Sequence, residues 1–359
     1  MKAAILAGGL GTRLRPLTYT TPKPLLPVLN VPMVRRLIER VPPEVDGVVL
    51  AVNYLADRIR AYLHAEPPPV PVEVVVEEEP LGTGGAVKNL EGRLGGERFL
   101  VMNGDVVCDA DLRAMVAAHR ASGAVGTIHV WPVEDPSRYG VVRADPSGRI
   151  HEFVEKPPAG RAPSNLINAG TYVLDHAVLD RIPAGRPVSM EREVFPALAR
   201  DGLFAFQGGS FWVDAGKPLD YLEAHRLLLE RRGDGLAATG AAGVALVPPV
   251  LAPATATVAA GARLGPNVCL GAGVRVGPGA HLSNTVVLDR ATVGEGASLE
   301  YAVVGFGASV GAHARLSRGT VVADGAKVEA GRTTGEFEAV GGPGPGGEGG
   351  SSGFGQGFG

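Results

Sequence analysis

A glycine-rich segment near the start of the chain carries two cations that are suited to binding phosphate groups. Gly8, Gly9 and Gly11 follow an apolar run, and Arg13 and Lys23 come next. Glycine leaves backbone N–H groups open to a close anion, and the arginine fork can bridge phosphate oxygens. Prolines on both sides of the lysine restrict where its amine can reach. We interpret the segment as a polyanion-binding loop rather than as a set of solvated surface charges.

The spacing of these glycines excludes two common phosphate-binding motifs. It is neither G-x-G-x-x-G nor G-x-x-x-x-G-K-[ST], which disfavours a dinucleotide-binding fold and a P-loop. A glycine-rich turn without charged neighbours could be purely structural. The two cations are therefore the features that indicate a ligand.

A parallel sheet should position this loop, because strand and helix patterns alternate through the first part of the chain. Such alternation is typical of right-handed crossovers, and open sheets of this kind bind ligands at the carboxyl ends of their strands. The predicted strands are Lys2–Ala7, Gly47–Val52, Val72–Val76, Phe99–Met102, Val125–Trp131, Gly140–Arg143, Ile150–Glu155, Gly170–Leu174 and Phe204–Phe206. The predicted helices are Met33–Arg40, Ala56–Leu63, Gly84–Leu90 and a closing helix from Pro218 to about Arg232.

The later part of the chain follows a six-residue period that is typical of a parallel β-helix. Each short face would point one aliphatic side chain inward, and stacked three-sided coils would bury a continuous column. About twelve hexapeptides predict about four coils. The predicted column, with five-residue steps at Val293 and Val304, is Val258, Leu264, Leu270, Val276, Leu282, Leu288, Val293, Leu299, Val304, Val310, Leu316, Val322 and Val328.

These patterns divide the chain into four parts. We predict a catalytic domain at 1–232, a small-residue linker at 233–250, a β-helix at 251–331 and a disordered glycine-rich tail at 332–359.

Composition narrows the class of protein. The formal net charge of −3 argues against a general nucleic-acid binder, and no run of eighteen apolar residues predicts a membrane span. Cys108 and Cys269 lie far apart in sequence and predict no disulfide framework. We therefore expect a cytoplasmic protein in a reducing compartment.

The loop "GGLGTRLRPLTYTTPKPLLPV" resembles the signature of the sugar-1-phosphate nucleotidylyltransferases, or NDP-sugar pyrophosphorylases. The family's further motifs follow in order as "EEEPLGTGGAV", "NGDVVCD", "SRYGVV", "FVEKP", "INAGTYVL", "EREVFPAL" and "FWVDAGKPLDYL". The last several most resemble the mannose-1-phosphate guanylyltransferase branch, as does the hexapeptide region. The resemblance implies an α/β fold with a Rossmann-like, mixed but mostly parallel sheet, followed by a left-handed parallel β-helix.

The resemblance also implies a reaction. A sugar 1-phosphate oxygen attacks the α-phosphorus of an NTP in line and releases pyrophosphate. Two like charges 4 Å apart cost about 4 kcal/mol at an effective dielectric of 20, so two polyanions need cations around them. By this resemblance Arg13 binds the triphosphate and Lys156 binds the sugar phosphate. Lys23 is a catalytic cation that could contact either phosphate group.

The other site residues are also implied by the resemblance. Asp105 and Asp214 would hold Mg²⁺, although Asp105 could be a turn former and Asp214 a cap of the last helix. Thr83 could equally be a plain N-cap. The nucleotide-binding residues would be Leu6, Gly8, Gly9, Gly11, Thr12, Gly82 and Thr83. The residues that bind the sugar phosphate would be Gly104, Gly140, Glu155, Lys156 and Asn168.

Other functions stay open on the sequence. GTP with mannose 1-phosphate is the preferred pair, and glucose 1-phosphate with UTP, dTTP or ATP is the alternative. A regulatory paralogue that binds NDP-sugar without turnover is a second alternative. Acyl transfer by the β-helix, with His281 or His313 as general base, would rest on fold analogy alone. We expect the β-helix to support contacts in a homo-oligomer.

Overall fold

The computed structural model describes residues 1–232 and 243–342. More than half of the predicted linker and more than half of the predicted tail lie outside these described residues.

The chain forms two compact units that divide the glycine-rich segment. The first unit contains Met1–Leu10 and Met33–Trp212, and the second contains Gly11–Pro32 together with the chain from Val213 onward. Residues that lie far apart in sequence are therefore joined in the second unit, where the cations of the loop accompany the C-terminal repeats.

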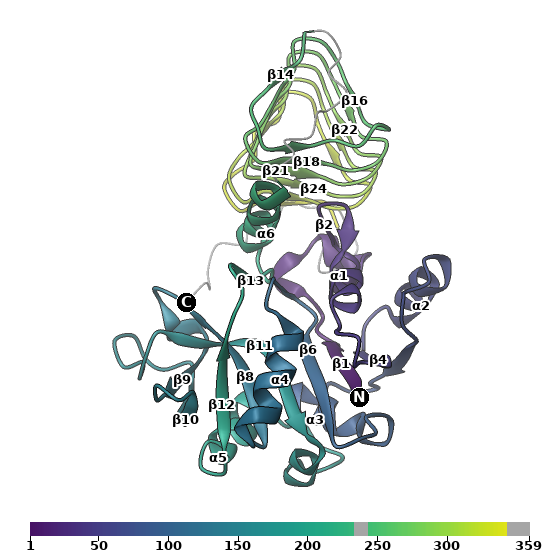
Figure 1. Cartoon of the computed structure of the whole chain (residues 1–359). Helices are drawn as coiled ribbons and strands as arrows, with labels where there is room; N and C mark the ends of the chain where they lie inside the picture. Colours follow the sequence, from purple (N-terminus) through teal and green to yellow (C-terminus); the bar gives the residue numbers. More distant parts are fainter. Residues whose placement is uncertain (233–242, 343–359) are drawn as a thin grey trace. The chain divides into compact units, whose positions relative to one another are not determined.

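A nine-stranded sheet forms the centre of the first unit, in the order β5-β4-β1-β6-β11-β8-β12-β10-β9 (Figure 1). Its strands are β1 (Lys2–Ala7), β4 (Gly47–Val52), β5 (Val72–Val76), β6 (Arg98–Asn103), β8 (Gly126–Pro132), β9 (Gly140–Ala144), β10 (Arg149–Glu155), β11 (Leu166–Asp175) and β12 (Leu203–Gln207). Strands β5, β4, β1 and β6 are parallel, and β1 is apolar after its first residue, as a strand with neighbours on both sides requires.

The predicted "mostly parallel" pairing holds for β5, β4, β1 and β6 and for β8 with β12, but not for the other neighbouring strands. Strand β11 is antiparallel to β6 and β8, and β10 is antiparallel to β9 and β12. The connection from β9 to β10 is a tight turn in which the Gly148 N–H donates to the Asp145 carbonyl oxygen at 2.9 Å. A connection this short can join only antiparallel strands, because a parallel pair needs a long crossover.

Helices connect these strands, and the last two are not among the helices predicted above. They are α1 (Met33–Glu39), α2 (Ala56–Ala65), α3 (Gly82–Asn89), α4 (Leu112–Ser122) and the short α5 (Phe195–Leu198). Helix α4 has a clear start, because the Asp111 carboxylate accepts a hydrogen bond from the Ala114 N–H at 2.9 Å. It ends at Gly123, whose φ of 64° is the left-handed conformation that glycine favours.

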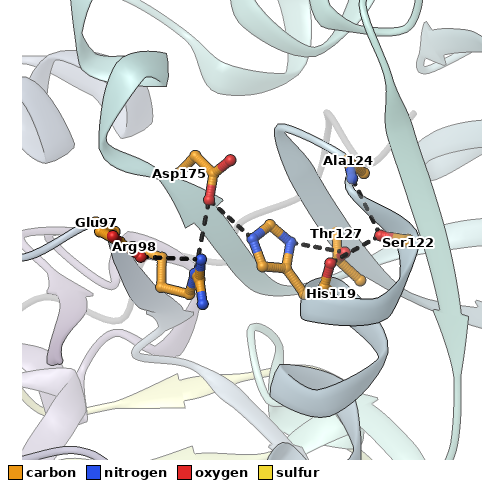
Figure 2. Close-up of polar contacts among 7 residues, drawn as sticks. All are labelled: Glu97, Arg98, His119, Ser122, Ala124, Thr127 and Asp175. Carbon is orange, nitrogen blue, oxygen red and sulfur yellow. Dashed lines mark hydrogen bonds and ion pairs between the residues drawn. The ribbon is translucent and has the colours of Figure 1, made fainter.

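A buried histidine links α4 to the sheet (Figure 2). His119 Nδ1 lies 3.0 Å from Thr127 Oγ1 and its Nε2 lies 3.1 Å from Asp175 Oδ1. Arg98 Nε lies 3.8 Å from the same carboxylate oxygen. Burial lowers the pKa of His119, and the hydrogen bond to Asp175 opposes that effect. Arg98 begins β6 and Asn103 ends it, so this network lies at the end of β6 opposite to the predicted site.

The C-terminal repeats of the second unit form three parallel sheets, and from β14 to β28 consecutive strands go to each sheet in turn (Figure 1). The first contains β14 (Ala245–Leu246), β17 (Arg263–Leu264), β20 (His281–Ser283), β23 (Ser298–Glu300) and β26 (Arg315–Leu316). The second contains β15 (Val250–Leu251), β18 (Val268–Leu270), β21 (Thr285–Val287), β24 (Val303–Val304), β27 (Val321–Val322) and β29 (Ala339–Val340). The third contains β16 (Thr257–Val258), β19 (Arg275–Val276), β22 (Thr292–Val293), β25 (Ser309–Val310) and β28 (Lys327–Val328).

The sheets have five or six strands each, so the stack is taller than the predicted four coils. Its strands begin before residue 251 and end after residue 331. The aliphatic column is largely as predicted, with one correction. Val287, not Leu288, pairs with Leu270 and Val304, so the first five-residue step comes one hexapeptide early. Both candidate residues are aliphatic and buried, and for that reason the period could not distinguish them.

The rest of the second unit consists of a hairpin, three short turns and a helix. The hairpin is β2 (Pro27–Val28) and β3 (Val31–Pro32), and its two turn residues, Leu29 and Asn30, have φ of 47° and 61°. Positive φ at both turn positions is the conformation of a type I′ turn. The single-turn helices are Thr12–Leu14, Leu17–Tyr19 and Lys23–Leu25, and the long helix is α6 (Pro218–Arg232). Two further short strands are β7 (Val106–Cys108), in the first unit, and β13 (Trp212–Asp214), where the chain passes from the first unit to the second.

Candidate active site

At the carboxyl end of β1, the backbone of Gly104 lies close to the end of the strand. The Gly104 N–H donates to the Leu6 carbonyl oxygen at 2.8 Å, and a Cβ on Gly104 would lie 2.7 Å from that oxygen. Gly104 thus holds the turn that carries Asp105 directly against the end of β1. A Cβ on Gly8 would lie 3.4 Å from Glu77 Oε2, whereas one on Gly9 would meet no described atom within 4 Å. Of these glycines, Gly9 is the one with open space for a ligand.

The segment that contains the predicted nucleotide-binding residues Gly82 and Thr83 is held by hydrogen bonds to a distant segment. The Gly84 and Gly85 N–H groups both donate to the Val188 carbonyl oxygen, at 2.8 and 3.2 Å. The Thr83 hydroxyl donates to Glu191 at 2.7 Å and accepts from the Met190 N–H at 2.9 Å. The N-cap position of α3 is Leu81, so the interpretation of Thr83 as a plain N-cap is wrong.

A bulge in β11 shapes the predicted sugar-binding residues. The Asn168 amide donates to the Tyr172 hydroxyl at 2.9 Å, and its carbonyl oxygen accepts from the Gly170 N–H at 3.0 Å. Gly170 has φ 75°, and a Cβ there would lie 2.8 Å from Asn103 Nδ2. Tyr172 is thus the centre of a polar cluster with Asn103 and Asn168. Burial raises the pKa of the Tyr172 hydroxyl.

Glu155 joins this cluster electrostatically. Burial raises the pKa of Glu155, the charge of Glu191 adds to that rise, and Lys156 opposes it. Gly140 permits the packing, because a Cβ there would lie 3.0 Å from Glu155 Oε2 and 2.5 Å from the Phe153 ring. Among the described residues, the buried atoms Glu155 Oε2 and Asn103 Oδ1 accept no hydrogen bond. Two such acceptors are suited to the hydroxyl donors of a sugar.

Lys156 follows β10 and presents its amine to solvent. Its side chain is 59% exposed, and Nζ lies 3.8 Å from Glu155 Oε1. Its φ of 49° is uncommon for a residue other than glycine, and its N–H donates to the Tyr139 carbonyl oxygen at 2.9 Å. The backbone turn therefore directs an exposed cation away from the end of a strand, next to the polar cluster.

The second unit brings together two predicted residues from distant segments. A Cβ on Gly216 would lie 2.8 Å from Arg13 Nη2 and 2.9 Å from Asp214 Oδ1. Only a residue without a side chain leaves room for both groups. Helix α6 begins at Pro218, which makes Lys217 its N-cap position, so Asp214 is not the cap of the last helix.

Lys23 is buried in the same unit, with 9% of its surface exposed. A Cβ on Gly11 would lie 3.2 Å from the Lys23 Cβ and 2.9 Å from Thr18 Cγ2, and Gly11 has φ 62°. The Thr18 hydroxyl donates to the Gly11 carbonyl oxygen at 2.9 Å. Gly11 is thus the pivot of the loop, with Thr12 and Arg13 in the single-turn helix that follows it.

The predicted residues therefore form two groups. The second unit contains Gly11, Thr12, Arg13, Lys23 and Asp214, and the first unit contains the rest. Within the described residues, no three His, Cys, Asp or Glu side chains gather as a metal-ligand group. Sequence reasoning missed Asn103, Tyr172 and Glu191. The motifs "INAGTYVL" and "EREVFPAL" contain the last two, but their spacing gives no sign that they meet.

No helix of the described residues is both long and apolar enough to span a membrane. The model of the Nucleotidyl transferase family matches residues 2–231, and the GMPPB C-terminal domain model matches residues 246–335. A mannose-1-phosphate guanyltransferase of Aspergillus oryzae is 44% identical over 335 residues, covering 90% of this chain and 91% of the relative. A mannose-1-phosphate guanylyltransferase catalytic subunit beta of Danio rerio is 40% identical over 331 residues, with the same coverage.

Solved structures are similar over part of the chain. HddC from Yersinia pseudotuberculosis, in a structure complexed with GMP-PN, has 31% identity and a TM-score of 0.54. The match covers 63% of this chain and 99% of that one. These comparisons confirm the family resemblance that the motifs predicted. The chain belongs to the nucleotidyl transferase family and, within it, to the mannose-1-phosphate guanylyltransferases.

Proposed function

We propose that this enzyme joins GTP and mannose 1-phosphate to give GDP-mannose and pyrophosphate. A phosphate oxygen of the sugar 1-phosphate forms a bond to the α-phosphorus, and the bond from that phosphorus to the pyrophosphate oxygen breaks. The enzyme's main task is to position two polyanions and stabilise their charge. The observation that carries the proposal is the meeting of Arg13 and Asp214 at Gly216, in a chain of this family.

The residues take the roles that the resemblance implies. Arg13 binds the triphosphate, Lys23 contacts one of the phosphate groups, and Lys156 binds the sugar phosphate. Glu155 accepts hydrogen bonds from sugar hydroxyls, and Asn168 both accepts and donates them. The buried acceptor Glu155 Oε2, which has no hydrogen-bond partner among the described residues, supports this role. Backbone groups at Gly8, Gly9, Gly82 and Thr83 contact the nucleotide.

Enzymes of this family generally use a divalent metal, and we propose Mg²⁺ with Asp105 and Asp214 as its protein ligands. Two carboxylates fit this ion, because Mg²⁺ takes one or two of them and completes its shell with water and phosphate oxygens. When bound, it would neutralise charge on the triphosphate.

We further propose that the three-sheet repeats form a left-handed β-helix and support a homo-oligomer in the cytoplasm. Consecutive strands that visit three parallel sheets in turn support the β-helix. Light scattering of the purified protein tests the assembly, and a monomer at all concentrations would exclude it.

A pyrophosphate-release assay tests the reaction, with five NTPs against several sugar 1-phosphates, in Mg²⁺ and in chelator. We expect the highest kcat/KM for GTP with mannose 1-phosphate, and loss of activity in chelator. Preference for glucose 1-phosphate with UTP, dTTP or ATP would replace the substrate assignment. Binding of GDP-mannose with no release from any pair would identify a regulatory paralogue. Activity unaffected by chelator would remove the metal roles of Asp105 and Asp214.

A further inference from the structure

The loop that carries Arg13 and Lys23 is attached to one face of the C-terminal repeats, within the second unit. Asp324 follows β27, and its Oδ2 accepts hydrogen bonds from the Thr20 hydroxyl at 2.5 Å and the Thr21 hydroxyl at 2.9 Å. Bonds to a carboxylate are stronger than bonds between neutral groups. Two consecutive loop residues thus share one carboxylate oxygen that lies more than 300 positions later in the chain.

A second attachment lies at the other end of the loop. The Asn30 side-chain amide, at the tip of the β2–β3 hairpin, donates to the Leu270 carbonyl oxygen at 2.8 Å. The Cys269 thiol lies 3.6 Å from Asn30 Oδ1. From α6, the Tyr221 hydroxyl donates to the Pro27 carbonyl oxygen. Strands β18 and β27 belong to the same sheet of the repeats, so one sheet holds both ends of the segment from Thr20 to Asn30.

The loop residues that contact Asp324 are close in sequence to Lys23. Thr21 is buried and is separated from Lys23 by Pro22 alone, whose ring leaves its φ little freedom. Lys23 itself is buried, so its amine has few alternative positions. A shift of the Thr20–Thr21 backbone would therefore be passed directly to Lys23.

The repeats contain an internal control for this contact. Asp289 occupies the equivalent corner two coils earlier, where its Oδ1 accepts from the Ala272 N–H at 2.8 Å. Asp324 Oδ1 makes the same bond to the Phe306 N–H at 2.9 Å. Both aspartates are half-buried, but only Asp324 has bonds to the loop. The shared bond serves the coil, and the extra bonds of Asp324 need a separate explanation.

We propose that Asp324 is a positioning residue, through which the C-terminal repeats hold the loop of Arg13 and Lys23 in its catalytic geometry. The proposal rests on the proposed function, because it assigns these cations to phosphate transfer. Misplacing a catalytic group by about 1 Å can cost about a hundredfold in rate, so a support outside the reacting groups can control activity.

The test compares Asp324→Ala with the matched variant Asp289→Ala in the full-length protein. Both lose the same bond to the neighbouring coil, and Asp324→Ala also loses the two bonds to the loop, so we expect the larger loss of thermal stability for Asp324→Ala. We expect Asp324→Ala to lower kcat about tenfold or more with KM for both substrates changed much less, and Asp289→Ala to stay within about twofold of wild type. Equal kinetics of the two variants would overturn the proposal.

The threonines provide the complementary test, which does not depend on how Asp324→Ala folds. The pair Thr20→Val with Thr21→Val should reproduce the loss of kcat, and the pair Thr20→Ser with Thr21→Ser should keep wild-type kcat because the hydroxyls remain. Adding Asp324→Ala to the valine pair should cause little further loss, as expected for groups that act through one contact. A valine pair with wild-type kcat would refute the proposal. A wild-type protein that releases no pyrophosphate would refute the proposed function instead.

Discussion

The first unit and the C-terminal repeats use polar side chains in opposite ways. In the first unit, polar groups gather where the backbone is irregular, as at the bulge around Gly170 and at Lys156 with its positive φ. In the repeats, the interior is an aliphatic column, and the buried polar residues described between 245 and 340 are threonines alone. The difference supports our proposal that the irregular strand ends of the first unit take part in the chemistry, whereas the regular coils act as a support.

The largest effect on activity should come from removing a cation at the proposed active site. Arg13→Ala should lower kcat/KM about a thousandfold, because the guanidinium would stabilise charge that develops on the triphosphate. Stability should change little, since the Arg13 side chain is exposed. Pyrophosphate release measured beside thermal unfolding separates the two effects.

Arg15 is the matched control for this prediction. It is an exposed arginine of the same loop, and its guanidinium lies 4.9 Å from the centre of the Tyr19 ring. Arg15→Ala should keep kcat/KM within a few fold. If the two substitutions reduced activity equally, general loop charge rather than Arg13 would explain the result.

The next prediction is the reverse of that for Arg13, because stability should be lost while catalytic activity is kept. Leu299 is 1% exposed and lies in register between Leu282 and Leu316, so Leu299→Ala should cost about 3 kcal/mol of unfolding free energy. Ser298→Ala, exposed on the same strand, should cost less than about 0.5 kcal/mol. Denaturant unfolding measures both. A kcat well below wild type for folded Leu299→Ala would show that the coils do more than support.

The same contrast explains what the sequence could predict. The column was predictable because each coil repeats one inward position, and the one error came where Val287 and Leu288 are equally apolar. Strand β1 and helix α6 were predictable because apolar pattern and Pro218 mark their limits. The meeting of Glu155 with Glu191, and of Thr20 with Asp324, was not, because both depend on contacts between distant segments that leave no local period.

The smallest effect concerns pH and again distinguishes the two regions. Burial lowers the pKa of His119 from 6.5, so as the pH falls below about 6.5 the unfolded chain takes up the proton before the folded one does. The unfolding free energy of the first unit should therefore fall in acid until the pH reaches the folded-state pKa of this histidine.

Calorimetry between about pH 5.5 and 7.5 should show a pH-dependent transition for this unit. The transition of the repeats should change less, because their histidines, such as His281, are exposed. His119→Gln should reduce the first dependence, with a remainder from the buried His129, whose pKa burial also lowers, whereas His281→Gln should alter neither. An unchanged slope in His119→Gln would mean that the network in Figure 2 does not control the acid stability of the sheet.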